Sequence, residues 1–111
     1  MMQAIVLDEI NQPDLEKVRE HCRCNLVPSR LDEVFWLELP PELLSPEQAG
    51  HAECAPHRVA VVVEEGAVKL ELLVRSQTSL RCACTAYATP AQREFLWDFA
   101  QSLVADLGIR T

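Results

Sequence analysis

A single β-hairpin, predicted between residues 58 and 75, constrains the fold of this 111-residue chain more than any other segment. Two runs rich in strand-forming residues flank Glu65-Gly66, a dipeptide typical of a two-residue hairpin turn. The turn fixes the register of the two strands, and on one face it predicts three apolar pairs: Val63 with Val68, Val61 with Leu70, and Val59 with Leu72. Lys69 and Glu71 fall on the other face. The hairpin is therefore expected in an antiparallel sheet with one buried face.

A third strand is predicted over residues 80–88, following a loop at 75–79. A loop with an odd number of residues sets Leu80 opposite Val74, so that apolar residues face each other. The hairpin and this strand together would form a three-stranded antiparallel meander.

The same register gives a prediction for the cysteines of the third strand. It places Cys82 beside Leu72 and Cys84 beside Leu70, on the face toward the core. Free cysteine in such a position behaves as a small hydrophobic residue. We therefore expect Cys82 and Cys84, together with Cys22 on the apolar face of a helix, to be buried and inert.

The rest of the chain supplies helices and two further strands. The patterns predict a strand at 4–7, a helix from Asn11 to about residue 25, a strand at 33–39, a short helix from Ser45 to Gly50, and a closing helix from Thr89 to Gly108. The expected fold is a single α+β domain over residues 1–111, with about five antiparallel strands and helices packed on the sheet. Its order is strand, helix, strand, short helix, three strands, helix. A variant of the ferredoxin-like arrangement is the nearest named architecture.

Two strands are apolar on both faces, which predicts that something covers their second face. The segment 34–37 reads Val-Phe-Trp-Leu, and Ala60 and Val62 lie opposite the buried valines of their strand. The cover is expected to be one of the helices or another subunit. In the second case Trp36, with Val34 and Val62, would form an interaction site for a protein partner or a homo-oligomer.

The charge balance excludes some partners. The net charge is −7 and the basic residues are scattered, so the basic surface that nucleic acids and anionic membranes need is missing. The first residues lack the charge and apolar length of a signal peptide. The sequence therefore predicts a cytoplasmic protein with reduced thiols.

The loop from residue 51 to 57 offers the best ligand set for a metal. His51, Cys54 and His57 are spaced by three residues, and Cys24 is the thiol expected to be exposed on the first helix. Imidazole and thiolate are the ligands that zinc and iron prefer, so these four residues form the predicted metal site, with zinc as the possible cofactor. The same loop allows an alternative, a thiol enzyme in which His57 activates Cys54.

No motif identifies a reaction, and the catalytic residues remain unknown. The chain has only three glycines and lacks the G-x-S-x-G, H-E-x-x-H and G-x-G-x-x-G patterns. The sequence thus favours a non-catalytic interaction or regulatory module. A metal-binding protein and a thiol enzyme are the alternatives.

Overall fold

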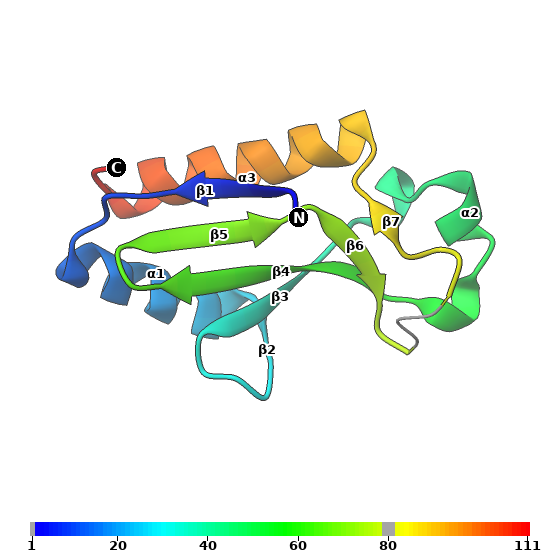
Figure 1. The fold of residues 1–111 in the computed structure, drawn as a ribbon, viewed down its shortest axis with the longest axis horizontal. Helices are drawn as coiled ribbons and strands as arrows, with labels where there is room; N and C mark the ends of the chain where they lie inside the picture. The colour runs from blue at the N-terminus through cyan, green and yellow to red at the C-terminus, as the bar shows by residue number, and fades with distance from the viewer. Residues whose placement is uncertain (1, 79–81) are drawn as a thin grey trace.

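The computed structural model describes residues 2–78 and 82–111. Its helices and antiparallel sheet confirm the predicted α+β class (Figure 1). The strands are β1 (Ala4–Leu7), β2 (Val27–Pro28), β3 (Val34–Glu38), β4 (His57–Glu64), β5 (Ala67–Glu71), β6 (Leu73–Ser76) and β7 (Ala86–Tyr87). The helices are α1 (Gln12–Asn25), α2 (Pro46–Ala49) and α3 (Pro90–Leu107), with short 3-10 turns η1 (Pro41–Leu43) and η2 (Ala52–Cys54).

The hairpin register is confirmed next to its turn. β4 pairs with β5 through Val63 with Val68 and Val61 with Leu70. Gly66 has a φ of 74°, which a residue without a side chain adopts at little cost. Strands β1, β5, β4, β3 and β2 lie side by side in this order, and β6 pairs with β4 beyond the end of β5.

The predicted register fails at Leu72. Farther along, β4 pairs with β6 through His57 with Ser76 and Arg58 with Arg75, so residues 59 and 60 of β4 face residues 71–74 of the other strand. Leu72 instead donates its N–H to Gln3 and accepts a hydrogen bond from Ala88. The two extra residues bend the strand, and β6 leaves the direction of β5 (Figure 1).

The third strand of the meander is much shorter than predicted. Only Ala86–Tyr87 forms β7, and Val74 pairs with Ala86 rather than with Leu80, which lies outside the described residues. Leu70 has Ile5 and Val61 as its neighbours, so the predicted position of Cys84 beside Leu70 is wrong. Cys82 and Cys84 lie instead in a turn before β7.

Helices α1 and α3 cover one face of the sheet (Figure 1). Leu15, Val18 and Cys22 of α1 belong to the same buried core as Leu96 and Leu103 of α3. The strand residues that complete this core are Phe35, Leu37, Val59, Val61, Val63, Val68 and Leu70. No helix in the described part of the chain is long and apolar enough to cross a membrane.

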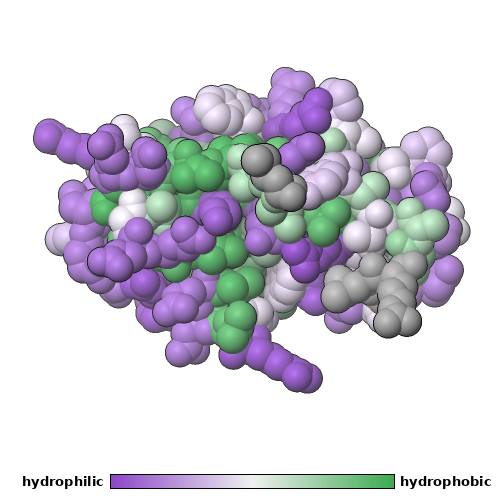
Figure 2. Space-filling view, viewed as in Figure 1, coloured by the Kyte–Doolittle hydropathy of each residue, from purple (hydrophilic) through white to green (hydrophobic). Residues whose placement is uncertain are grey.

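The opposite face of the sheet is not under α1 or α3, because both belong to the core of the first face. A row of paired residues crosses it, from Val34 through Val62 and Lys69 to Val6. Figure 2 shows apolar surface crossing the molecule in this view. Trp36 lies on the same face, half-buried, with the Arg58 guanidinium 4.2 Å from its ring centre. Of the predicted covers of this face, the first helix is therefore excluded, because α1 packs on the other face.

Candidate metal centre

Four thiol and imidazole side chains meet at the end of the sheet where β4, β6 and β7 pair. One ligand atom from each of His51, Cys54, Cys82 and Cys84 lies within 4.8 Å of every other. We call these four residues the Cys/His cluster. Four zinc ligands at bond lengths near 2.3 Å stand about 3.8 Å apart in a tetrahedron, so the cluster has the size of a zinc site.

Cys82 contacts all three other members of the Cys/His cluster. Its Sγ lies 3.0 Å from Nδ1 of His51, 3.3 Å from Sγ of Cys54 and 3.0 Å from Sγ of Cys84. These sulfur–sulfur distances are shorter than the edge of a zinc tetrahedron. Binding of an ion would therefore lengthen each of these sulfur–sulfur distances by less than about 1 Å.

Two tight turns bring the ligands together. The backbone N–H of Cys54 donates to the carbonyl of His51, so the two residues flank η2 at the i and i+3 positions, which lie on the same side of such a turn. The N–H of Thr85 donates to the carbonyl of Cys82, which closes the turn that carries the C-x-C pair. The C-x-C pair and the H-x-x-C pair therefore each supply two ligands, as paired ligands do in structural zinc sites.

The surroundings shift the pKa values of the Cys82 and Cys84 thiols in opposite directions. Burial, followed by the hydrogen bonds with Cys82 and Cys54, raises the pKa of Cys84 to about 12. The side-chain hydrogen bond with Cys84 is the main cause that lowers the pKa of Cys82. Cys82 is thus the readier of these two thiols to become a thiolate, the form that binds metal, and metal binding must displace the remaining protons.

A chain of buried amides holds the turn of Cys84. Nε2 of Gln48 donates to the carbonyl of Cys84 at 3.2 Å, and Nε2 of Gln92 donates to Oε1 of Gln48 at 2.9 Å. Gln48 and Gln92 are 2% and 0% exposed, and each also completes the capping box of its own helix, α2 or α3. The amide chain therefore connects the N-terminus of α3 to the backbone of Cys84, a member of the Cys/His cluster.

The other half of the Cys/His cluster is held from β6. The hydroxyl of Ser76 donates to the carbonyl of Cys54 at 2.9 Å, and that of Thr78 donates to the carbonyl of Glu53 at 3.3 Å. Both pairs of ligands thus have backbone carbonyls fixed by side chains from other segments. Such support lowers the entropy that is lost when a metal orders its ligands.

His57 lies beside the Cys/His cluster rather than in it. Its Nε2 is 3.4 Å from Sγ of Cys84, and the ring is 1% exposed. Burial is the main cause that lowers the pKa of His57, and the charge of His51 contributes, so the ring is neutral at pH 7. With a thiolate at Cys84, Nε2–H is a hydrogen-bond donor to a metal-bound sulfur.

The structure brings together two of the four residues predicted to bind a metal. His51 and Cys54 belong to the Cys/His cluster, and His57 contacts Cys84 rather than Cys54. Cys24 is exposed on α1, where its Sγ lies 3.6 Å from Glu20, and it is no member of the cluster. Cys22 is fully buried, as predicted.

Cys84 is 1% exposed, as predicted, whereas Cys82 is only half-buried, and both thiols lie in the Cys/His cluster rather than in the core beneath α1 and α3. Alternation of apolar residues at 80, 82, 84 and 86 suggested a strand, but Arg81 to Ala86 contains one β-branched residue, Thr85. That low strand propensity, together with a C-x-C pair and an H-x-x-C pair in one short chain, is the signal in the sequence for the Cys/His cluster.

A cleft of about 630 Å³ borders the centre. Its wall includes His57 and Gln48, and the rest is mostly apolar, with Leu39, Leu44 and Pro56 among the lining residues. The cleft reaches the Cys/His cluster only through His57 and Gln48, which contact Cys84, because none of the four cluster residues lines it.

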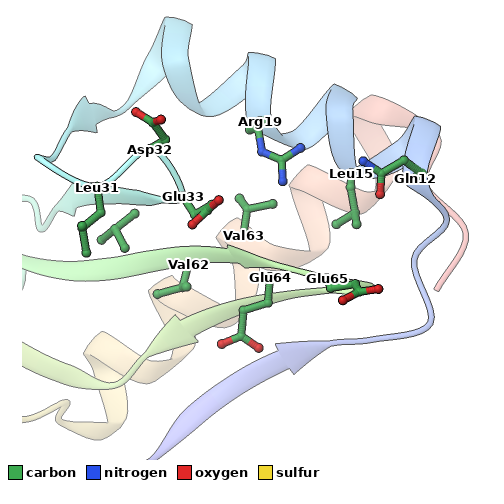
Figure 3. A pocket seen from close by; sticks show the side chains of 11 residues that line it. Gln12, Leu15, Arg19, Leu31, Asp32, Glu33, Val62, Val63, Glu64 and Glu65 are labelled. Atoms are coloured by element: carbon green, nitrogen blue, oxygen red, sulfur yellow. The ribbon is translucent and has the colours of Figure 1, made fainter.

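A second cavity, of about 600 Å³, lies at the other end of the sheet, between α1 and the strands β3 and β4 (Figure 3). Asp32, Glu33, Glu64 and Glu65 line it together with Arg19, which forms an ion pair with Glu16. Imidazole and thiol groups are absent from its lining residues. The Cys/His cluster is therefore the better candidate site for a soft metal ion.

Comparisons with known proteins give no match: none was found among protein-family models, curated proteins or solved structures.

Proposed function

We propose that this protein binds one zinc ion through Nδ1 of His51 and the sulfurs of Cys54, Cys82 and Cys84. The observation that carries the proposal is the approach of these four ligand atoms to within 4.8 Å of one another. Iron–sulfur clusters use similar ligands, but a single tetrahedral set of three sulfurs and one imidazole is typical of structural zinc.

The role of the ion is structural. Four protein ligands fill a tetrahedral shell, whereas catalytic zinc keeps one position for water. The ion would join the turn at residues 51–54 to the turn at 82–84, segments that are about thirty residues apart in the chain. Three thiolates and one neutral imidazole leave the centre with a net charge of −1, and the N–H of His57 offsets part of it.

Metal analysis of untagged protein tests the proposal. We expect one zinc per chain in the wild type, and loss of zinc on Cys54→Ser, Cys82→Ser or His51→Ala. Cys24→Ser is the matched control, because it removes a thiol outside the Cys/His cluster and should leave the zinc content unchanged. Zinc well below stoichiometry in freshly purified wild type, or equal zinc in Cys54→Ser and Cys24→Ser, would contradict the proposal.

Cobalt substitution identifies the ligands independently. Three thiolate ligands give tetrahedral Co²⁺ strong sulfur-to-metal charge-transfer absorption, and each Cys→Ser variant should reduce it. An unchanged spectrum in Cys84→Ser would remove that residue from the site.

A second candidate function is protein interaction through the open face of the sheet. It is supported by Val6, which is 51% exposed, and by the row that continues from it through Lys69 and Val62 to Val34, in which Lys69 is the one charged residue. Partly exposed apolar side chains in a row, next to Trp36, resemble the centre of a protein interface. We infer a protein partner or a second copy of this chain.

Sedimentation of the wild type and of Val62→Lys tests this second candidate. Concentration-dependent association that Val62→Lys abolishes would support a second copy of the chain. Two results together would contradict an interface on this face. The wild type would stay monomeric, and Val62→Lys would raise the thermal stability without loss of any partner from a pull-down.

A further inference from the structure

Cys82 is the most accessible sulfur of the Cys/His cluster. It is half-buried, while Cys54 is 5% exposed and Cys84 is 1% exposed. A small oxidant from solvent therefore reaches Cys82 first. Metal-bound cysteine is a thiolate, and reactivity toward peroxide follows thiolate character and accessibility.

Two sulfurs are close enough to react with an oxidised Cys82. Cys54 lies 3.3 Å and Cys84 3.0 Å from its Sγ. Cys84 is only two residues away and shares the turn closed by the Thr85–Cys82 hydrogen bond. A disulfide within so short a segment strains the torsion about the S–S bond, whereas Cys54 comes from a separate segment and can adjust. Cys54 is thus the better partner.

We infer that Cys82 is a site of oxidation by hydrogen peroxide, that Cys54 resolves it to a disulfide, and that the centre then releases its metal. The release rests on the proposed zinc site, while the pairing of Cys82 with Cys54 rests on the geometry of the thiols alone. Oxidation-sensitive cysteines commonly combine an accessible thiolate with a neighbouring resolving thiol.

The chemistry proceeds in two steps. The thiolate of Cys82 attacks one oxygen of hydrogen peroxide, the O–O bond breaks, and the products are a sulfenic acid and hydroxide. The thiolate of Cys54 then attacks Sγ of Cys82, the S–S bond forms, the S–O bond breaks, and a second hydroxide leaves. Two electrons pass from the sulfurs to the peroxide. The zinc ion keeps only His51 and Cys84 as ligands and dissociates.

Cys24 provides an internal control for this reaction. It is more exposed than Cys82 but lies outside the Cys/His cluster, beside the Glu20 carboxylate. If accessibility alone governed oxidation, Cys24 would react first. If the cluster governs it, Cys82 reacts first.

The test uses zinc-loaded wild-type protein whose zinc content has been measured beforehand. Hydrogen peroxide is added in stoichiometric steps, zinc release is followed with a chromophoric chelator, and the cysteines are mapped by alkylation and peptide mass spectrometry. We expect one zinc released per peroxide consumed, a Cys54–Cys82 disulfide, and oxidation of Cys82 on the order of ten times faster than of Cys24. Cys24→Ser should respond like the wild type.

Two results would overturn the inference. One is a Cys82–Cys84 disulfide as the main product, and the other is oxidation of Cys24 before Cys82. If the protein proves to lack zinc, the proposed function fails, but the same mapping on metal-free protein still tests the pairing of Cys54 with Cys82. Dithiothreitol followed by zinc should restore the metal content of the oxidised protein.

Discussion

Replacing Gln92 tests how strongly α3 supports the centre. Gln92 accepts a hydrogen bond from the Thr89 N–H and donates to Leu43 and to Gln48, in a site that is 0% exposed. At about 1 kcal/mol for each hydrogen bond, Gln92→Ala should lower the free energy of unfolding by about 3 kcal/mol. That equals a fall in melting temperature of about 12 °C for a domain of this size.

The same substitution should weaken zinc binding. Gln92 donates to Oε1 of Gln48, and Nε2 of the same Gln48 amide donates to the carbonyl of Cys84. Gln92→Ala therefore removes a hydrogen bond that orients the amide in contact with Cys84. Loss of an outer-shell partner typically reduces metal affinity by about 10-fold or more. Gln92→Glu separates capping from this contact, because its carboxylate can still accept from Thr89 but cannot donate to Gln48. We expect it to lose at least as much stability as Gln92→Ala, because its carboxylate would face the oxygens of Leu43 and Gln48 in a site that is 0% exposed, and to lose as much zinc affinity.

Urea unfolding of metal-free protein and zinc titration against a competing chelator measure the two effects. Gln101→Ala is the matched control, since Gln101 is exposed on the same helix. It should change the free energy of unfolding by less than about 0.5 kcal/mol. The reasoning is refuted if Gln92→Ala costs less than about 1 kcal/mol, or if it loses stability with no change in zinc affinity.

Three further predictions concern the core, the buried thiol and the aromatic contact. Urea unfolding should show that Leu96→Ala lowers the free energy of unfolding by about 3 kcal/mol, because Leu96 is 0% exposed. Trp97→Ala, at the exposed neighbouring residue, should lower it much less. Equal losses in the two variants would contradict the packing of α3. Burial raises the pKa of Cys22 from 9.0 to about 11, so the folded state retains a proton that the unfolded state releases as the pH rises. The free energy of unfolding should therefore fall by about 1.4 kcal/mol between pH 8 and 10. Urea titrations of Cys22→Ala should lack this contribution. In a Trp97→Phe background, which removes the second tryptophan, Arg58→Ala should expose Trp36 and shift its fluorescence emission to the red, while Arg110→Ala at the exposed C-terminal end should leave the spectrum unchanged.

Local patterns predicted the helices and the hairpin well, for physical reasons that each segment carries. The caps at Asn11, Ser45 and Thr89 form the expected hydrogen bonds, and Gly108 ends α3 with a φ of 63°. The Glu65-Gly66 turn determines the register of the residues next to it. These signals depend on neighbours in the chain, which a sequence displays directly.

The sequence did not predict the full Cys/His cluster, because its geometry depends on hydrogen bonds between residues far apart in the chain. The hairpin register was extended past Leu72, but Leu72 makes its backbone hydrogen bonds with Gln3 and Ala88, which no local pattern announces. Once the strand bends there, Cys82 and Cys84 leave the core face and meet His51 and Cys54. Cys82 and Cys84 were therefore assigned to packing, and Cys24 and His57 were included in the predicted ligand set in their place.

The bend at Leu72 also separates two parts of the molecule that should open with different free energies. On one side of it, β1, β5, β4 and β3 share the apolar core beneath α1 and α3. On the other side, β7 has only two residues in the sheet, and its segment depends on the Cys/His cluster and on two glutamines. Amide hydrogen exchange should thus show residues 82–88 opening with little free energy when the metal is removed, while the strands of the core remain protected. The proposed zinc ion would then leave and return without unfolding of the domain.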